Sequence, residues 1–101
     1  MASGTILTGR TIFHKLLKGT TSAAGNLVTG LNTADYIIIG VATNRTQSGY
    51  LTESYNLLPC GADASGNLFL TAVKPSDMSL IARTAIAVDI WYISGDSVDV
   101  T

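Results

Sequence analysis

Side chains able to perform acid–base or nucleophilic chemistry are few in this chain. It has one histidine, His14, and one cysteine, Cys60. An enzyme needs a nucleophile, or an acid and a base, held within reach of one another. The acidic residues are instead spread singly along the sequence: Asp35, Glu53, Asp63, Asp77, Asp89, Asp96 and Asp99. We therefore expect no enzyme and no catalytic residue. His14 should be packed or at the surface, and Cys60 should be a small buried hydrophobic residue.

The ligand spacing of metal sites is also missing. The chain has no pair of histidines, no second cysteine and no aspartate-rich loop of the calcium-binding kind. Asp63 and Asp77 could bind calcium from loops, but such residues more often cap turns. The glycines from Gly61 to Gly66 lack the lysine and the following helix of a phosphate loop, and they indicate a hairpin turn. The sequence predicts neither a metal nor a cofactor.

Binding chemistry is better represented, in one polar loop. Carbohydrate sites combine amide, guanidinium and carboxylate groups with an aromatic ring that is apolar on its face and polar at its tip. The loop over residues 44–50 carries amide groups, a guanidinium group and a tyrosine from this set, and a further tyrosine follows it. The candidate ligand-binding residues are Asn44, Arg45, Gln47, Tyr50 and Tyr55. The alternative interpretation is an ordinary solvated hairpin loop.

Two strands that the sequence indicates clearly must position these residues. The segments 36–43 and 85–93 are rich in β-branched and aromatic residues. In the second, one side carries Ile86, Val88, Ile90 and Tyr92, and the opposite side carries Ala87, Asp89, Trp91 and Ile93. Both sides are thus largely apolar, and a chain of 101 residues has little interior with which to cover both. We expect a partner subunit to bury the second side through Ala87, Trp91 and Ile93.

Further short strands are expected over residues 4–8, 27–31, 50–58 and 67–73. Residues 11–18 fit a helix or a strand, and their threonine and aromatic content favours the strand. Pro59 should end the 50–58 strand, since proline is excluded from a central ladder. Residues 63–66 should form a hairpin turn, 74–77 a connection, and 78–83 a short strand or an irregular edge. These elements predict one domain over residues 1–101, an all-β, jelly-roll-like antiparallel β-sandwich of six to eight short strands.

The composition narrows the classes of partner. Hydrophobic residues make up 47% of the chain and charged residues 13%, with a net charge of −1. Disorder needs the opposite balance, and nucleic-acid binding normally needs a basic stripe. No apolar run is long enough for a membrane-spanning helix. High apolarity with little charge instead predicts contact with other copies of the chain.

The order of elements has a family resemblance that is carried by three hydrophobic motifs. These are ADYIIIG (34–40), NLFLTAV (67–73) and VDIWYI (88–93). The chain resembles the carboxy-terminal tip domains of bacteriophage tail fibres over about residues 27–93. The resemblance implies a lectin-like β-sandwich head that forms a homotrimer, belongs to the virion after assembly in the host cytoplasm, and binds host-surface glycan or protein. It implies no particular receptor-contacting residue. The other hypothesis is a structural virion protein for capsid decoration or tail assembly.

Overall fold

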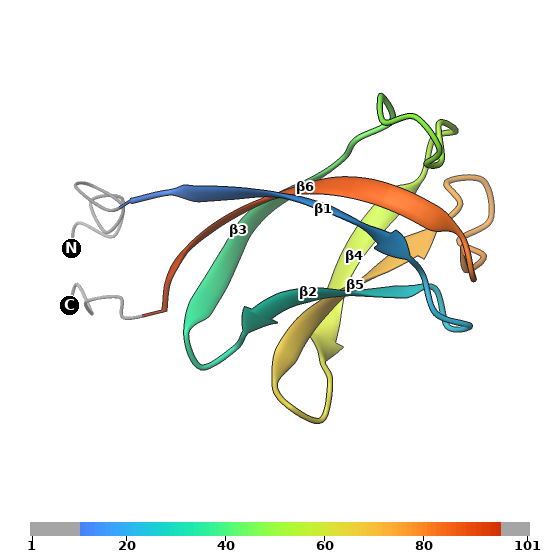
Figure 1. Ribbon diagram of the computed structural model, residues 1–101. Helices are drawn as coiled ribbons and strands as arrows, with labels where there is room; N and C mark the ends of the chain where they lie inside the picture. The colour runs from blue at the N-terminus through green and yellow to red at the C-terminus, as the bar shows by residue number, and fades with distance from the viewer. Residues whose placement is uncertain (1–10, 96–101) are drawn as a thin grey trace.

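A computed structural model describes residues 11–95 of the chain, and all regular structure in this part is β-strand (Figure 1). The strands are β1 (Phe13–Thr20), β2 (Asn26–Asn32), β3 (Tyr36–Thr43), β4 (Asn56–Ala62), β5 (Asn67–Val73) and β6 (Ala85–Ser94). The expected all-β class is confirmed. Within the described residues, no helix is long and apolar enough to cross a membrane.

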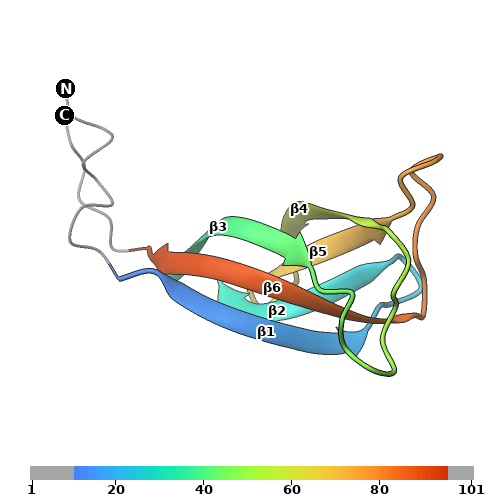
Figure 2. The same cartoon turned by 90° about the horizontal axis from the view of Figure 1, so that it is seen from above.

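The strands form two three-stranded antiparallel sheets. Sheet A has the order β1-β6-β3, and sheet B has the order β2-β5-β4. The chain passes from one sheet to the other at every connection between the described strands except the β4–β5 hairpin. Figure 2 views the molecule with sheet A in front of sheet B. At the end where β1 begins and β6 ends, sheet A extends beyond sheet B (Figure 1).

A hydrophobic core joins the two sheets. Strand β6 contributes Ile86, Val88 and Ile90, none of which has exposed surface. Sheet B contributes Leu27, Leu31, Leu70 and Ala72 to the same cluster. The alternation in β6 thus places one side of this central strand in the interior, as its sequence predicts. Tyr92 continues this side where sheet A extends past sheet B, and its ring lies against Phe13 and Tyr36.

The segment 11–18, which fits either a helix or a strand by sequence, contributes to strand β1. Residues 13–20 pair with β6 along their whole length, with Leu17 opposite Val88. The helical spacing of the apolar residues is overridden because the strand buries one side against the core and completes the ladder of β6. The expected strand over residues 4–8 lies outside the described residues.

The prediction for residues 50–58 is wrong at both ends. Residues 50–55 form no strand, and β4 runs through Pro59 to Ala62. Pro59 is tolerated because β4 is an edge strand, where one side of the ladder is unpaired. Cys60 lies between Pro59 and Gly61 at an irregularity of the register and is exposed, so its predicted burial is also wrong.

The two predicted connections are present, and an aspartate orders each of them. In the β4–β5 turn, Asp63 Oδ1 accepts hydrogen bonds from the N–H groups of Ser65 and Asn67, each at 2.9 Å. Gly66 takes a φ of 86°, the left-handed conformation that such a turn requires. In the β5–β6 connection, Asp77 Oδ1 accepts from the N–H of Ser79 at 2.9 Å. Both carboxylates thus serve as turn caps.

Candidate functional site

The outer face of sheet A is the side of the sheet that points away from the core. The register places His14, Trp91 and Gly40 in one row across it, and Leu16, Asp89 and Ala42 in the next. The rows on either side contain Ile37 with Ile93, and Lys18 with Ala87. One face of the sheet therefore carries both the predicted subunit contact and the only histidine of the chain.

Large apolar side chains remain exposed on this face. The exposed fractions are 41% for Leu16, 42% for Ile37 and 37% for Trp91. Ile39, the unpaired residue at the β3 irregularity next to this face, is 41% exposed. Contiguous apolar surface of this kind marks an interaction site more often than scattered hydrophobic residues do.

Two of the three residues expected at the subunit contact have little surface to offer. Ala87 is 0% exposed and Ile93 is 4% exposed within the single chain. They cannot contribute much buried area to a partner, because that area is already withdrawn from water. Trp91 remains available, and its neighbours Leu16, Ile37 and Ile39 replace the other two as candidate contacts.

A polar network interrupts the apolar surface at Asp89. His14 Nε2 lies 2.8 Å from Asp89 Oδ1, and Asn44 Nδ2 donates to Asp89 Oδ2 at 3.2 Å. The imidazole also lies against the indole of Trp91, with ring centroids 5.1 Å apart. Sequence reasoning treated His14 and Asp89 as isolated, because 75 residues separate them and only the β1–β6 register brings them together. Within residues 11–95, no serine, threonine or cysteine side chain is hydrogen-bonded to His14.

The polar loop predicted to bind a ligand lies between β3 and β4, and two of its side chains are engaged within the chain. Asn44 is bonded to Asp89 and, through its Oδ1, to the backbone N–H and hydroxyl of Thr46. Arg45 Nη1 donates to Ser54 Oγ at 2.9 Å. These bonds fix the shape of the loop rather than leaving both groups free for a ligand.

The remaining candidate residues separate into surface and core. The ring of Tyr50 is half-buried, with Lys18 Nζ 5.7 Å from its centroid, and the carbonyl of Gln47 accepts the N–H of Tyr50 at 3.2 Å. Tyr55 is only 4% exposed and belongs to the core cluster, so it cannot stack on a sugar. Its hydroxyl donates to the carbonyl of Ala87 at 2.8 Å, and burial raises the pKa of Tyr55.

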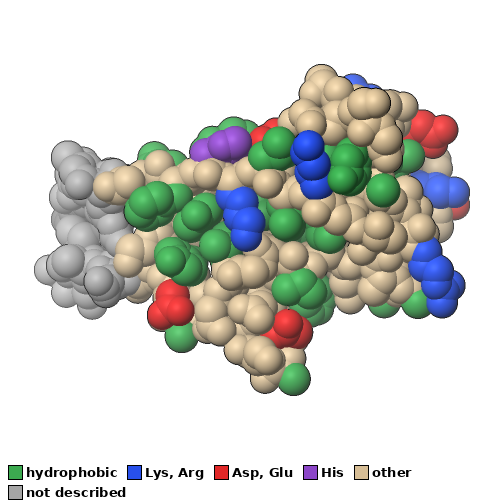
Figure 3. All heavy atoms as spheres, in the orientation of Figure 1, with side chains coloured by type: hydrophobic (Ala, Val, Ile, Leu, Met, Phe, Trp, Pro, Cys, Tyr) green, Lys and Arg blue, Asp and Glu red, His purple; other side chains and the backbone are tan. Residues whose placement is uncertain are grey.

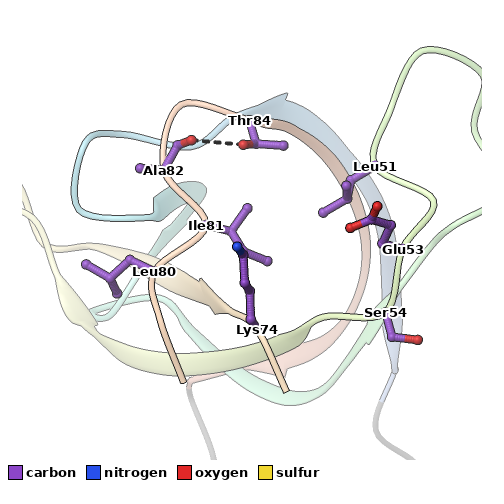
Figure 4. Close-up of a pocket in the computed structure, with 8 residues that line it drawn as sticks. All are labelled: Leu51, Glu53, Ser54, Lys74, Leu80, Ile81, Ala82 and Thr84. Atoms are coloured by element: carbon purple, nitrogen blue, oxygen red, sulfur yellow. Dashed lines mark hydrogen bonds between the residues drawn. The ribbon is translucent and has the colours of Figure 1, made fainter. Parts of the chain in front are cut away.

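A hollow of about 380 Å³ lies between residues 50–55 and the β5–β6 connection (Figure 4). It is lined by Leu51, Glu53, Ser54, Lys74, Leu80, Ile81, Ala82 and Thr84. Figure 4 shows the charged ends of Glu53 and Lys74 directed into this space from different segments. Sequence reasoning missed this pair, because nothing local to either residue indicates that the two segments meet.

No family model, curated protein or solved structure matches this chain. The likeness to tail-fibre tips therefore depends on short hydrophobic motifs alone. Three features of the chain's own side chains bear on its function. They are the exposed apolar face of sheet A, the polar loop whose side chains are hydrogen-bonded within the chain, and the charged hollow next to that loop.

Proposed function

We propose that this chain is a virion attachment module, a non-enzymatic β-sandwich head that self-associates and contacts host-surface glycan or protein. The observation that carries the proposal is the separation of two ends of the molecule. The start of β1 and the end of β6 lie together at one end, where Phe13 pairs with Tyr92. The loops 44–55 and 74–84 lie at the other end (Figures 1 and 2). A head held at the end where β1 starts and β6 ends would present these loops outward.

Self-association is the second part of the proposal, and we infer a homotrimer of jelly-roll-like sandwiches. The exposed apolar residues of the outer face of sheet A, with Trp91 near their middle, supply the contact. Figure 3 shows that hydrophobic side chains also reach the surface on another side of the molecule, among many polar ones. Grouping several heads multiplies a weak single-site contact into useful avidity without a deep pocket.

Two measurements on the full chain test this function. Analytical ultracentrifugation should give the mass of three chains, and the oligomer should bind whole host cells or a glycan array. Absence of binding by the oligomer at high protein concentration would remove the attachment role. A monomer in dilute buffer would remove the avidity on which that role depends.

A structural virion protein, for capsid decoration or tail assembly, is the second candidate. The observation in its favour is that Asn44 and Arg45 are bonded within the chain and that Tyr55 is in the core, so three of the five predicted ligand contacts are already occupied. The exposed apolar face would then contact another virion protein. Co-purification with particles, and loss of particle stability on removal of the chain, would support this role over attachment.

A further inference from the structure

We propose that the hollow between residues 50–55 and 74–84 binds a sugar unit that carries a carboxylate. This inference rests on the proposed attachment function and names the class of glycan that it would recognise. The site differs from the predicted polar loop, because its charged groups are Glu53 and Lys74 rather than Asn44 and Arg45. Glycans that end in acidic sugars are therefore the proposed ligands.

The charged groups of the hollow make no direct side-chain contact with another described residue, although Lys74 acts on Asp77 at longer range and helps to lower the pKa of its carboxyl. Neither Glu53 nor Lys74 forms a hydrogen bond or an ion pair through its side chain with another residue of the range 11–95. Both side chains are exposed, yet both point into the same space (Figure 4). The ammonium group of Lys74 can bind a carboxylate, and the carboxylate of Glu53 can accept two hydrogen bonds from neighbouring hydroxyl groups.

The rest of the lining suits a sugar ring. Leu80, which is 50% exposed, and the half-buried Leu51 provide apolar surface against which the C–H face of a ring can pack, while the charged groups meet its polar edge. The volume of about 380 Å³ falls within the range of small-molecule sites. A ring that is apolar on one face and hydroxylated around its edge matches this mixture of surfaces.

Both walls of the hollow are anchored to the sheets. On one side, the N–H of Leu51 donates to the carbonyl of Ala85 at 2.9 Å. On the other, the N–H of Ile81 donates to the carbonyl of Ala72 in β5 at 2.9 Å. The connection is also closed on itself, because the N–H of Lys74 donates to the carbonyl of Ser79 at 2.9 Å. Anchored walls lower the ordering cost of binding, which favours a ligand that makes few contacts.

A short peptide with free termini is the competing ligand, because its amine could pair with Glu53 and its carboxylate with Lys74. The half-apolar lining favours the sugar, since the backbone of a small peptide has little apolar face to cover Leu51 and Leu80. A glycine dipeptide serves as the probe for this alternative.

The test titrates the full-length oligomer with glucuronic acid, glucuronamide, glucose and the glycine dipeptide, followed by NMR chemical shifts. Glucuronic acid should bind, and both neutral sugars should bind about tenfold more weakly, a difference of about 1.4 kcal/mol. Lys74→Met and Glu53→Gln should each weaken glucuronic acid by a similar factor. Asp35→Asn, which changes a charge outside the hollow, is the matched control and should bind as the wild type does.

Equal binding of glucuronic acid and glucuronamide, or unchanged binding by Lys74→Met, would overturn the carboxylate assignment. Preference for the dipeptide would overturn the sugar. If the oligomer binds host cells but glucuronic acid neither binds nor competes, the inference fails and the attachment function stands. If the oligomer binds neither cells nor acidic sugars, both fail.

Discussion

Replacing Tyr55 with phenylalanine removes one buried hydroxyl and leaves the ring in place. The hydroxyl donates to the carbonyl of Ala87 at 2.8 Å, and that same carbonyl also accepts the N–H of Asn44 at 2.9 Å. The carbonyl therefore keeps one partner in the variant. We expect the free energy of unfolding to fall by about 1 kcal/mol, the usual net value of one hydrogen bond. Truncation to alanine should cost about 3–5 kcal/mol, because the core loses the ring as well.

Urea or thermal unfolding, followed by circular dichroism, measures this loss. Protein concentration must be the same in all samples, since any association of chains would also stabilise the folded state. For a domain of this size, about 1 kcal/mol corresponds to a fall in Tm of about 4–8 °C. Tyr50→Phe is the matched control: Tyr50 is half-buried, and its hydroxyl forms no hydrogen bond with another described residue. Its stability should change by less than about 0.5 kcal/mol.

The stability of Tyr55→Phe should also depend on pH differently from that of the wild type. Burial raises the pKa of Tyr55 above the ordinary value of 10.0. The associated stability is therefore complete below pH 10.0 and is lost as pH rises through the higher pKa of the folded state. Tyr55→Phe should lack this alkaline loss. A variant as stable as the wild type, or one that keeps its fold but loses ligand binding, would refute a structural role for this tyrosine.

Three further substitutions probe the core, the sheet face and a turn. Val88→Asp should prevent folding, because Val88 has no exposed surface and the aspartate would be unpaired; a cooperative melting transition in circular dichroism would contradict this. Trp91→Ser should keep the fold and reduce the sedimenting mass, whereas Val28→Ser, at a more exposed apolar site on sheet B (46% against 37%), should not; unchanged mass for both would place the contact elsewhere. The Ser79 hydroxyl and N–H lower the pKa of Asp77, so its stabilisation is present above the ordinary value of 3.8 and is lost as pH falls further. The Tm difference between the wild type and Asp77→Asn should accordingly shrink in acid, and a constant difference would count against this capping role.

The strands that cover the core could be predicted because their signals are local. The segment 36–43 was predicted with the bounds that β3 has, and the side of β6 that faces the core, with Ile86, Val88 and Ile90, follows from the two-residue period of a strand. The 63–66 turn follows from an aspartate and a glycine at fixed separation. In each case the deciding interactions lie within a few residues, where side-chain period and turn chemistry act directly.

Residues 44–55 could not be predicted, because their structure is set by distant strands. The N–H groups of Asn44 and Leu51 donate to carbonyls of Ala87 and Ala85 in β6, more than thirty residues along the chain. The alternating pattern around Tyr55 therefore indicated a strand, although this segment crosses from sheet A to sheet B and forms none. The tyrosine is buried by that crossing, and no local signal separates it from an exposed aromatic residue of a binding loop.

Asp89 limits how a partner chain can cover the outer face of sheet A. This limit bears on both parts of the proposal, self-association and ligand binding. Burying this carboxylate fully would be costly unless its hydrogen bonds to His14 and Asn44 survived in the contact. The opposite half of the face, around Ile37 and Ile39, carries no such charge and loses only apolar exposure. A subunit contact centred between Trp91 and β3 therefore gains most of the available apolar area while leaving Asp89 at the polar rim. That position also leaves the loops after β3 and β5 uncovered for a ligand.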